Sequence, residues 1–177
     1  MELNKCINER RSIRKYLDKP IEKEKIIELI EAAQKAPSWK NSQVSRFYVV
    51  DTKKTDFESC LAEFNKVNVK NAPIIIVSTV KKNRSGFERD GSYSTHLKEG
   101  FQYFDNGLQV QNLCLKAYDL GLGTLIMGLY EEKKIRETLN IPEEQEIVTV
   151  IAVGYPDENP EMPKRKNIKD IVKFINV

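Results

Sequence analysis

The sequence lacks the residues on which most side-chain catalysis and metal binding depend. It has a single histidine, His96, and three widely spaced cysteines, Cys6, Cys60 and Cys114. One histidine cannot make a two-histidine metal site, and without a CxxC pair neither a zinc ribbon nor a disulfide framework is supported. There is also no Walker A loop, no GxSxG elbow and no HExxH helix. These absences argue against nucleotide hydrolases, serine hydrolases and zinc proteases.

Long apolar runs and a strong charge of one sign are missing as well. No apolar run approaches the ~18 residues of a membrane span, and residues 1–5 contain no apolar signal region. We therefore expect a cytoplasmic protein with no membrane partner. The 29 Lys and Arg residues outnumber the 26 Asp and Glu residues only slightly, and the net charge of +3 is too small to indicate nucleic-acid binding. A chain of 177 residues predicts one domain, residues 1–177.

Hydrophobic periodicity predicts interleaved helices and strands. The expected helices cover residues 3–9, 22–36, 54–66, 101–120 and 131–139, and the expected strands cover residues 46–50, 73–77, 122–127 and 146–153. Residues 81–100 break the pattern and are long enough for a lid or a binding loop. The short elements and the long irregular stretches favour an α+β sandwich over a regular doubly wound sheet.

Two segments suggest a protein partner. The helix over residues 101–120 has apolar residues on more than one face, which predicts that protein encloses it. The tail from about residue 156 contains three prolines and ends in an apolar stretch over residues 168–175. Proline-rich segments are extended, so this stretch needs a surface to cover it. Composition alone leaves open whether that surface belongs to the same domain or to a second subunit.

Four clusters are candidate ligand contacts. Residues 10–14, RRSIR, place three guanidinium groups and a hydroxyl close together, which suits a phosphate, although cations at a helix C-terminus are also stabilised by the helix dipole. The basic run at residues 164–166 could reach the same phosphate or simply face solvent. Residues 36–43, APSWKNSQ, provide polar side chains on a loop. The glycines of residues 121–128 allow close backbone approach, but they do not form the GxGxxG fingerprint of a Rossmann site.

These clusters, in this order, resemble the nitroreductase family of FMN-dependent oxidoreductases. The motifs that carry the resemblance are RRSIR, APSxxNxQ, GLGT, GYP and the KRK tail, and they span almost the whole chain. The resemblance implies a central mixed, largely antiparallel sheet flanked by helices. It also implies a homodimer that binds two FMN molecules at the interface between its subunits.

The resemblance assigns individual residues to the FMN. Those implied at the phosphate and ribityl end are Arg10, Arg11, Ser12, Lys164 and Arg165. Those implied around the ring are Arg14 near N1 and O2, Asn65 at the pyrimidine end, and Ile126, Met127 and Gly128 near N5. The other subunit would contribute Pro37, Ser38, Trp39 and Asn41.

A flavin would also explain why catalytic side chains are scarce, because the cofactor itself carries the hydride chemistry. The resemblance implies a ping-pong reaction in which NADH or NADPH reduces FMN and leaves before an acceptor, such as a nitroaromatic or a quinone, binds. The alternatives are a flavin reductase or a reductive dehalogenase of the same family, a non-catalytic flavin-binding module, and a basic nucleic-acid-binding domain. The last of these lacks aromatic residues interleaved with its basic clusters.

The sequence departs from the family pattern at three places. Trp39 stands where a small residue is more common, and Val44 and Ser45 follow Gln43 where the family usually has a proline and an aromatic residue. Asn68 falls where some relatives carry a second basic residue near the flavin. These departures leave the substrate range and the redox tuning open.

Overall fold

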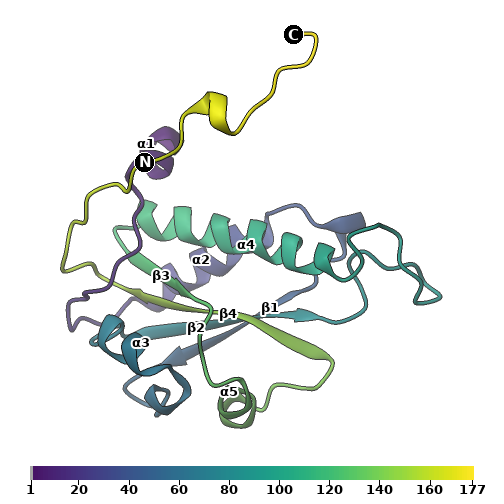
Figure 1. Cartoon of the computed structure of the whole chain (residues 1–177). Helices are drawn as coiled ribbons and strands as arrows, with labels where there is room; N and C mark the ends of the chain where they lie inside the picture. The colour runs from purple at the N-terminus through teal and green to yellow at the C-terminus, as the bar shows by residue number, and fades with distance from the viewer. Residues whose placement is uncertain (1) are drawn as a thin grey trace.

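The computed structural model describes residues 2–177 and contains one four-stranded sheet (Figure 1). Its strands are β1 (Ser45–Asp51), β2 (Ile74–Lys81), β3 (Gly123–Met127) and β4 (Gln145–Gly154), in the order β1-β2-β4-β3. All three neighbouring pairs are antiparallel, and a parallel bridge between Ser12 and Thr124 adds the N-terminal segment beside β3. The sheet is thus mixed and largely antiparallel, and the predicted fold class is confirmed.

Helices cover both faces of the sheet (Figure 1). On one face lie α2 (Lys23–Gln34) and α4 (Gly100–Asp119), and on the other lie α3 (Glu63–Asn68) and α5 (Glu132–Leu139). The remaining helix, α1 (Leu3–Glu9), contacts α4. Two apolar cores result, one on each face.

The alternation of side chains along β2 explains the two cores. Ile74 and Ile76 pack with α2 and α4, whereas Ile75 and Val77 pack on the opposite face. Residues 74–80 are buried along their whole length because β2 is central and covered on both faces. The uninterrupted apolar run over residues 74–77 reflects this cover on both faces of the strand.

One predicted helix is wrong in part. In place of a helix over residues 54–66, the chain forms a 3-10 helix, Glu58–Cys60, and then the short α3. Between them Leu61 is extended, with φ −103° and ψ 148°, and forms a β-bridge with Tyr130. The carbonyl of Cys60 also accepts the N–H of Glu131 at 2.8 Å. These long-range backbone bonds replace the helical ones that the local sequence favours.

The tail leaves the domain instead of packing on it. Residues 161–177 are all exposed, and the only regular element that the described residues form there is a 3-10 turn, Ile168–Asp170. Figure 1 shows the tail passing α1 and pointing away from the sheet. Its apolar side chains, such as Phe174 with 71% exposure, are therefore uncovered in a single chain. Within residues 2–177, no helix combines the length and the hydrophobicity that crossing a membrane requires.

Candidate functional site

The segment Arg10–Arg14 lies against β3. The N–H of Ile13 donates to the carbonyl of Thr124 at 3.0 Å, and the Ile13 side chain is buried. Gly123 permits this approach, because a Cβ at that position would lie 2.5 Å from Cγ1 of Ile13. The side chains of Ser12 and Arg14 are exposed on either side of buried Ile13, as expected of an extended backbone. Both side chains therefore face outward together.

Tyr16 fixes the end of this segment. Its hydroxyl donates to the carbonyl of Ile13 at 2.7 Å, and its ring is buried. Burial is the main cause that raises the pKa of Tyr16, so the hydroxyl stays protonated and remains a donor. The segment is therefore held by the core from beneath, while its polar side chains stay on the surface.

The arginines of the cluster have different surroundings. The guanidinium of Arg11 donates to the carbonyls of Asn8 and Arg10 at 2.7 and 2.9 Å, and so caps the C-terminal end of α1. No ion pair within residues 2–177 involves Arg10 or Arg14, and the backbone N–H of Arg14 donates to the carboxylate of Glu158. The helix-dipole interpretation thus applies to Arg11, whereas Arg10 and Arg14 have guanidinium groups available for an anion.

The predicted ring contacts follow along β3. Ile126 is 49% exposed and Gly128 is exposed, whereas the side chain of Met127 is buried and leaves only its backbone to a ligand. Asn65 is buried, and its Nδ2 donates to the carbonyl of Leu129 at 3.0 Å. The structure therefore brings the predicted residues at 10–14, at 126–128 and at position 65 to one strip beside β3.

The loop containing Pro37, Ser38, Trp39 and Asn41 lies elsewhere. The N–H of Trp39 donates to Oδ2 of Asp105 at 3.0 Å, near the start of α4. The RRSIR segment lies at the other end of α4, where the hydroxyl of Tyr118 donates to Glu9 of α1 at 2.7 Å. With a rise of 1.5 Å per residue, Asp105 and Tyr118 are ~20 Å apart. One chain therefore does not bring the two groups of predicted residues together.

Lys164 and Arg165 stand apart from both groups. They are exposed in the tail, and Arg165 donates to the carbonyl of Pro163 at 2.9 Å. The start of the tail is close to the N-terminal segment, since the N–H of Asp157 donates to the carbonyl of Lys15 at 2.9 Å. Among the described residues, no hydrogen bond or ion pair joins Lys164 or Arg165 to Arg10. Their convergence on one phosphate stays a prediction.

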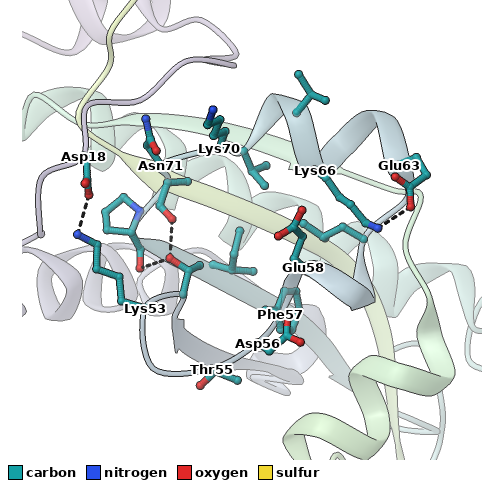
Figure 2. A pocket seen from close by; sticks show the side chains of 17 residues that line it. Asp18, Lys53, Thr55, Asp56, Phe57, Glu58, Glu63, Lys66, Lys70 and Asn71 are labelled. Carbon is teal, nitrogen blue, oxygen red and sulfur yellow. Dashed lines mark hydrogen bonds and ion pairs between the residues drawn. The ribbon is translucent and has the colours of Figure 1, made fainter.

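A cavity of about 740 Å³ lies on the α3 side of the sheet, and none of the predicted residues lines it (Figure 2). Its apolar wall includes Phe57 and Leu61, and its rim carries cations and carboxylates that partly pair, as in the ion pair of Lys53 with Asp18 at 2.6 Å. This cavity therefore has no strong excess of either charge.

Sequence reasoning missed a set of buried polar residues in the first half of α4. Gln102, Asp105, Asn106 and Gln109 are all buried. Asn106 donates to the hydroxyls of Ser45 and Ser78. The available signal was their spacing of three and four residues, which places them on the same helix face as the apolar residues of the second half.

Comparisons with known proteins decide the family. The model of the nitroreductase family matches residues 7–69 and 56–155. The chain belongs to the nitroreductase family. The predicted resemblance is therefore confirmed over most of the sequence.

Three relatives illustrate the match. A protein of Archaeoglobus fulgidus, provisionally named an NADH dehydrogenase/NAD(P)H nitroreductase, is 33% identical over 90% of this chain and 88% of its own length. The NADPH-flavin oxidoreductase of Vibrio harveyi is 29% identical over 88% of this chain and 66% of its own. The crystal structure of a nitroreductase family protein from Clostridium novyi NT covers 92% of this chain and 89% of its own, with 30% identity and a TM-score of 0.76.

Proposed function

We propose that this chain reduces nitroaromatic, quinone or similar acceptors with electrons from NADH or NADPH, in a ping-pong reaction at bound FMN. Its family and the names of its relatives make it an FMN-dependent NAD(P)H oxidoreductase. The observation that carries the proposal is the strip beside β3. It brings together Arg10 and Arg14, which form no ion pair among the described residues, the exposed backbone of Gly128 and the buried side-chain amide of Asn65. When bound, FMN supplies the hydride chemistry, and the protein supplies binding, orientation and charge.

The residues of this strip suit an FMN. Arg10 has a guanidinium available for a phosphate, and the exposed hydroxyl of Ser12 adds a neutral donor near it. Arg14 would place its charge at the N1 and O2 edge of the ring. Gly128 has open space where a Cβ would be, which leaves its backbone accessible near N5. Asn65 keeps the chain after Gly128 in place through its bond to Leu129.

A second copy of the chain would complete the site. In this proposal the protein is a homodimer, and the loop of Trp39 and Asn41 from one subunit covers the FMN that the other subunit holds at Arg10. The ~20 Å between the two groups in one chain supports this arrangement. Uncovered apolar side chains also support it, among them Phe104 on α4 with 55% exposure and the end of the tail. The tail would then lie on the partner, with Lys164 and Arg165 near a phosphate.

Free flavin is the second candidate acceptor. Relatives named NADPH-flavin oxidoreductase and FMN reductase support it. The two acceptor classes can be separated by their rates, since a flavin reductase would oxidise NAD(P)H faster with added FMN or riboflavin than with a nitroaromatic.

Anaerobic stopped-flow absorbance tests the proposed reaction. The purified protein should carry flavin absorbance that NADH or NADPH bleaches and that a nitroaromatic or quinone restores in a separate mixing step. Steady-state double-reciprocal plots should be parallel at different acceptor concentrations. Bound flavin that neither nucleotide reduces would leave a non-catalytic flavin module, and intersecting plots would contradict the ping-pong order.

A further inference from the structure

The loop over residues 38–43 has a backbone conformation that its sequence does not favour. Lys40, Asn41 and Gln43 have φ angles of 47°, 53° and 48°. Residues other than glycine rarely occupy this left-handed region, because the Cβ is crowded there. Three such residues within four positions need contacts that hold the loop in place.

Asp105 provides these contacts from the buried face of α4. Its Oδ2 accepts the backbone N–H of Trp39 at 3.0 Å and the hydroxyl of Ser42 at 3.4 Å. Asp105 is only 1% exposed, so water cannot easily replace a lost donor. Within the loop, Oγ of Ser38 accepts the N–H of Gln43 at 3.1 Å. One carboxylate oxygen therefore fixes the loop at Trp39 and Ser42, which flank two of its strained residues, Lys40 and Asn41.

The same oxygen binds a second segment. The hydroxyl of Ser85, which is fully buried, donates to Oδ2 of Asp105 at 2.6 Å. Ser85 belongs to the irregular connection between β2 and α4. An exposed ion pair between Lys40 and Glu88, at 3.1 Å, joins the same two segments at the surface, where such pairs contribute little. Asp105 is thus the buried link between the loop, the connection and α4.

The ring of Trp39 is also held by α4. It packs edge-on against the ring of Phe101, with the ring centroids 4.7 Å apart. The ring of Phe101 packs in turn against that of Phe104, with their centroids 5.4 Å apart. Phe101 lies one helical turn before Asp105, so the backbone and the ring of Trp39 depend on the same stretch of helix. Movement at Asp105 would therefore move Trp39.

We propose that Asp105 is a positioning residue of the FMN site. It holds the loop in the conformation in which Trp39 and Asn41 reach the FMN of the partner subunit. This inference rests on the proposed function, which assigns the loop to FMN. Asp105 has no cationic partner among residues 2–177. Burying a carboxylate without such a partner has a large desolvation cost, so a contribution to stability alone does not explain this residue.

Trp39 emission tests this directly, because Trp39 is the only tryptophan of the chain. In the full-length protein, Asp105→Ala should shift the emission to longer wavelength and raise acrylamide quenching several-fold. The matched control is Leu113→Ala, which removes a fully buried apolar side chain two turns further along α4. It should lower the melting temperature but leave Trp39 emission at the parent value.

FMN binding provides the second measurement. Asp105→Ala should raise the FMN dissociation constant at least tenfold, and Asp105→Asn should raise it less, because a carboxamide oxygen can still accept. Ser42→Ala and Ser85→Ala each remove one donor and should give intermediate values. If Asp105→Ala does not fold, these two serine variants test the proposal in its place. Parent values of both emission and FMN affinity in these variants would overturn the proposal.

A control on the parent protein separates this inference from the proposed function. Oxidised flavin absorbs where tryptophan emits, so bound FMN should quench Trp39 strongly if the loop covers the cofactor. Tight FMN binding with unquenched Trp39 emission would overturn the link between Asp105 and FMN. Failure of the parent to bind FMN at all would instead overturn the proposed function.

Discussion

The N–H of Ile13 donates to the carbonyl of Thr124 at 3.0 Å, and this bond sets the position of the N-terminal arginines relative to β3. It joins residues that are far apart in the sequence. Through it, the basic N-terminal segment forms a parallel β-bridge, between Ser12 and Thr124, at the edge of the sheet. The residues proposed for the phosphate end and for the ring end of the FMN site are therefore both attached to β3.

The contact between Gly123 and Ile13 should be sensitive to size. A Cβ at position 123 would lie 2.5 Å from Cγ1 and 2.9 Å from Cβ of Ile13, so Gly123→Ala should displace the RRSIR segment. We expect weaker FMN binding and a loss of ~1–3 kcal/mol in the free energy of unfolding, typical of overpacking. Ile13→Ala should relieve part of this clash. A double-mutant cycle measured by denaturant unfolding should therefore show that the two losses do not add.

Arg10 and Arg11 should respond differently to substitution by alanine. Arg10→Ala should weaken FMN binding by about 1.5–3 kcal/mol, as should Arg165→Ala, if both bind the phosphate by charge-assisted hydrogen bonds. Arg11→Ala should act mainly on stability, because Arg11 donates to the last carbonyls of α1. Calorimetric titration with FMN, with melting temperatures for all three variants, distinguishes these roles. An unchanged FMN affinity for Arg10→Ala and Arg165→Ala would refute the phosphate assignment.

Arg14 should affect the reduction potential more than the affinity. A cation near N1 and O2 stabilises the reduced anionic flavin more than the neutral oxidised form. A differential of about 1.4 kcal/mol corresponds to about 30 mV for a two-electron couple, so Arg14→Met should lower the potential by roughly that amount. It should also slow reduction by nicotinamide, while Arg14→Lys should stay closer to the parent. Spectroelectrochemical titration measures the difference, and equal potentials for all three proteins would make Arg14 an ordinary surface cation.

The cysteines should resist alkylation in the native protein. Cys6, Cys60 and Cys114 are 5%, 0% and 2% exposed. Burial also raises the pKa of the Cys114 thiol, so at a given pH less thiolate forms there than in an exposed cysteine. Mass spectrometry after iodoacetamide at pH 8 should show no labelling until denaturant is added. Rapid native labelling with loss of turnover would contradict the buried, unreactive assignment.

The sequence predicted the elements better than their long-range contacts. The apolar run at β2 and the apolar spacing within α2 and α4 are local signals. They predicted these elements correctly because the fold buries the same apolar side chains. The helix expected over residues 54–66 was wrong because Leu61 pairs with Tyr130, which no local pattern encodes. Asp105 was missed for the same reason, since its three donors come from two segments that only the tertiary structure brings to α4.

The candidate site shows the same limit. Motif order proposed residues for an FMN site, and the structure gathers those at 10–14, 65 and 126–128 into one strip. It also separates the loop of Trp39 from this strip by ~20 Å along α4. The sequence alone could not show this separation, because it depends on which end of α4 each segment meets. The separation is what makes the second subunit necessary in the proposed function.

Subunit complementation tests this shared site most directly. Arg10→Ala and Asn41→Ala homodimers should each bind FMN poorly and turn over slowly, because every site contains the lesion. In a mixed dimer of the two variants, purified through two different tags, one site would carry both lesions and the other neither. We predict about one FMN per mixed dimer and about half of the parent turnover. Mixed dimers no more active than either homodimer, or a parent protein that is a fully active monomer by sedimentation, would contradict a site built from two chains.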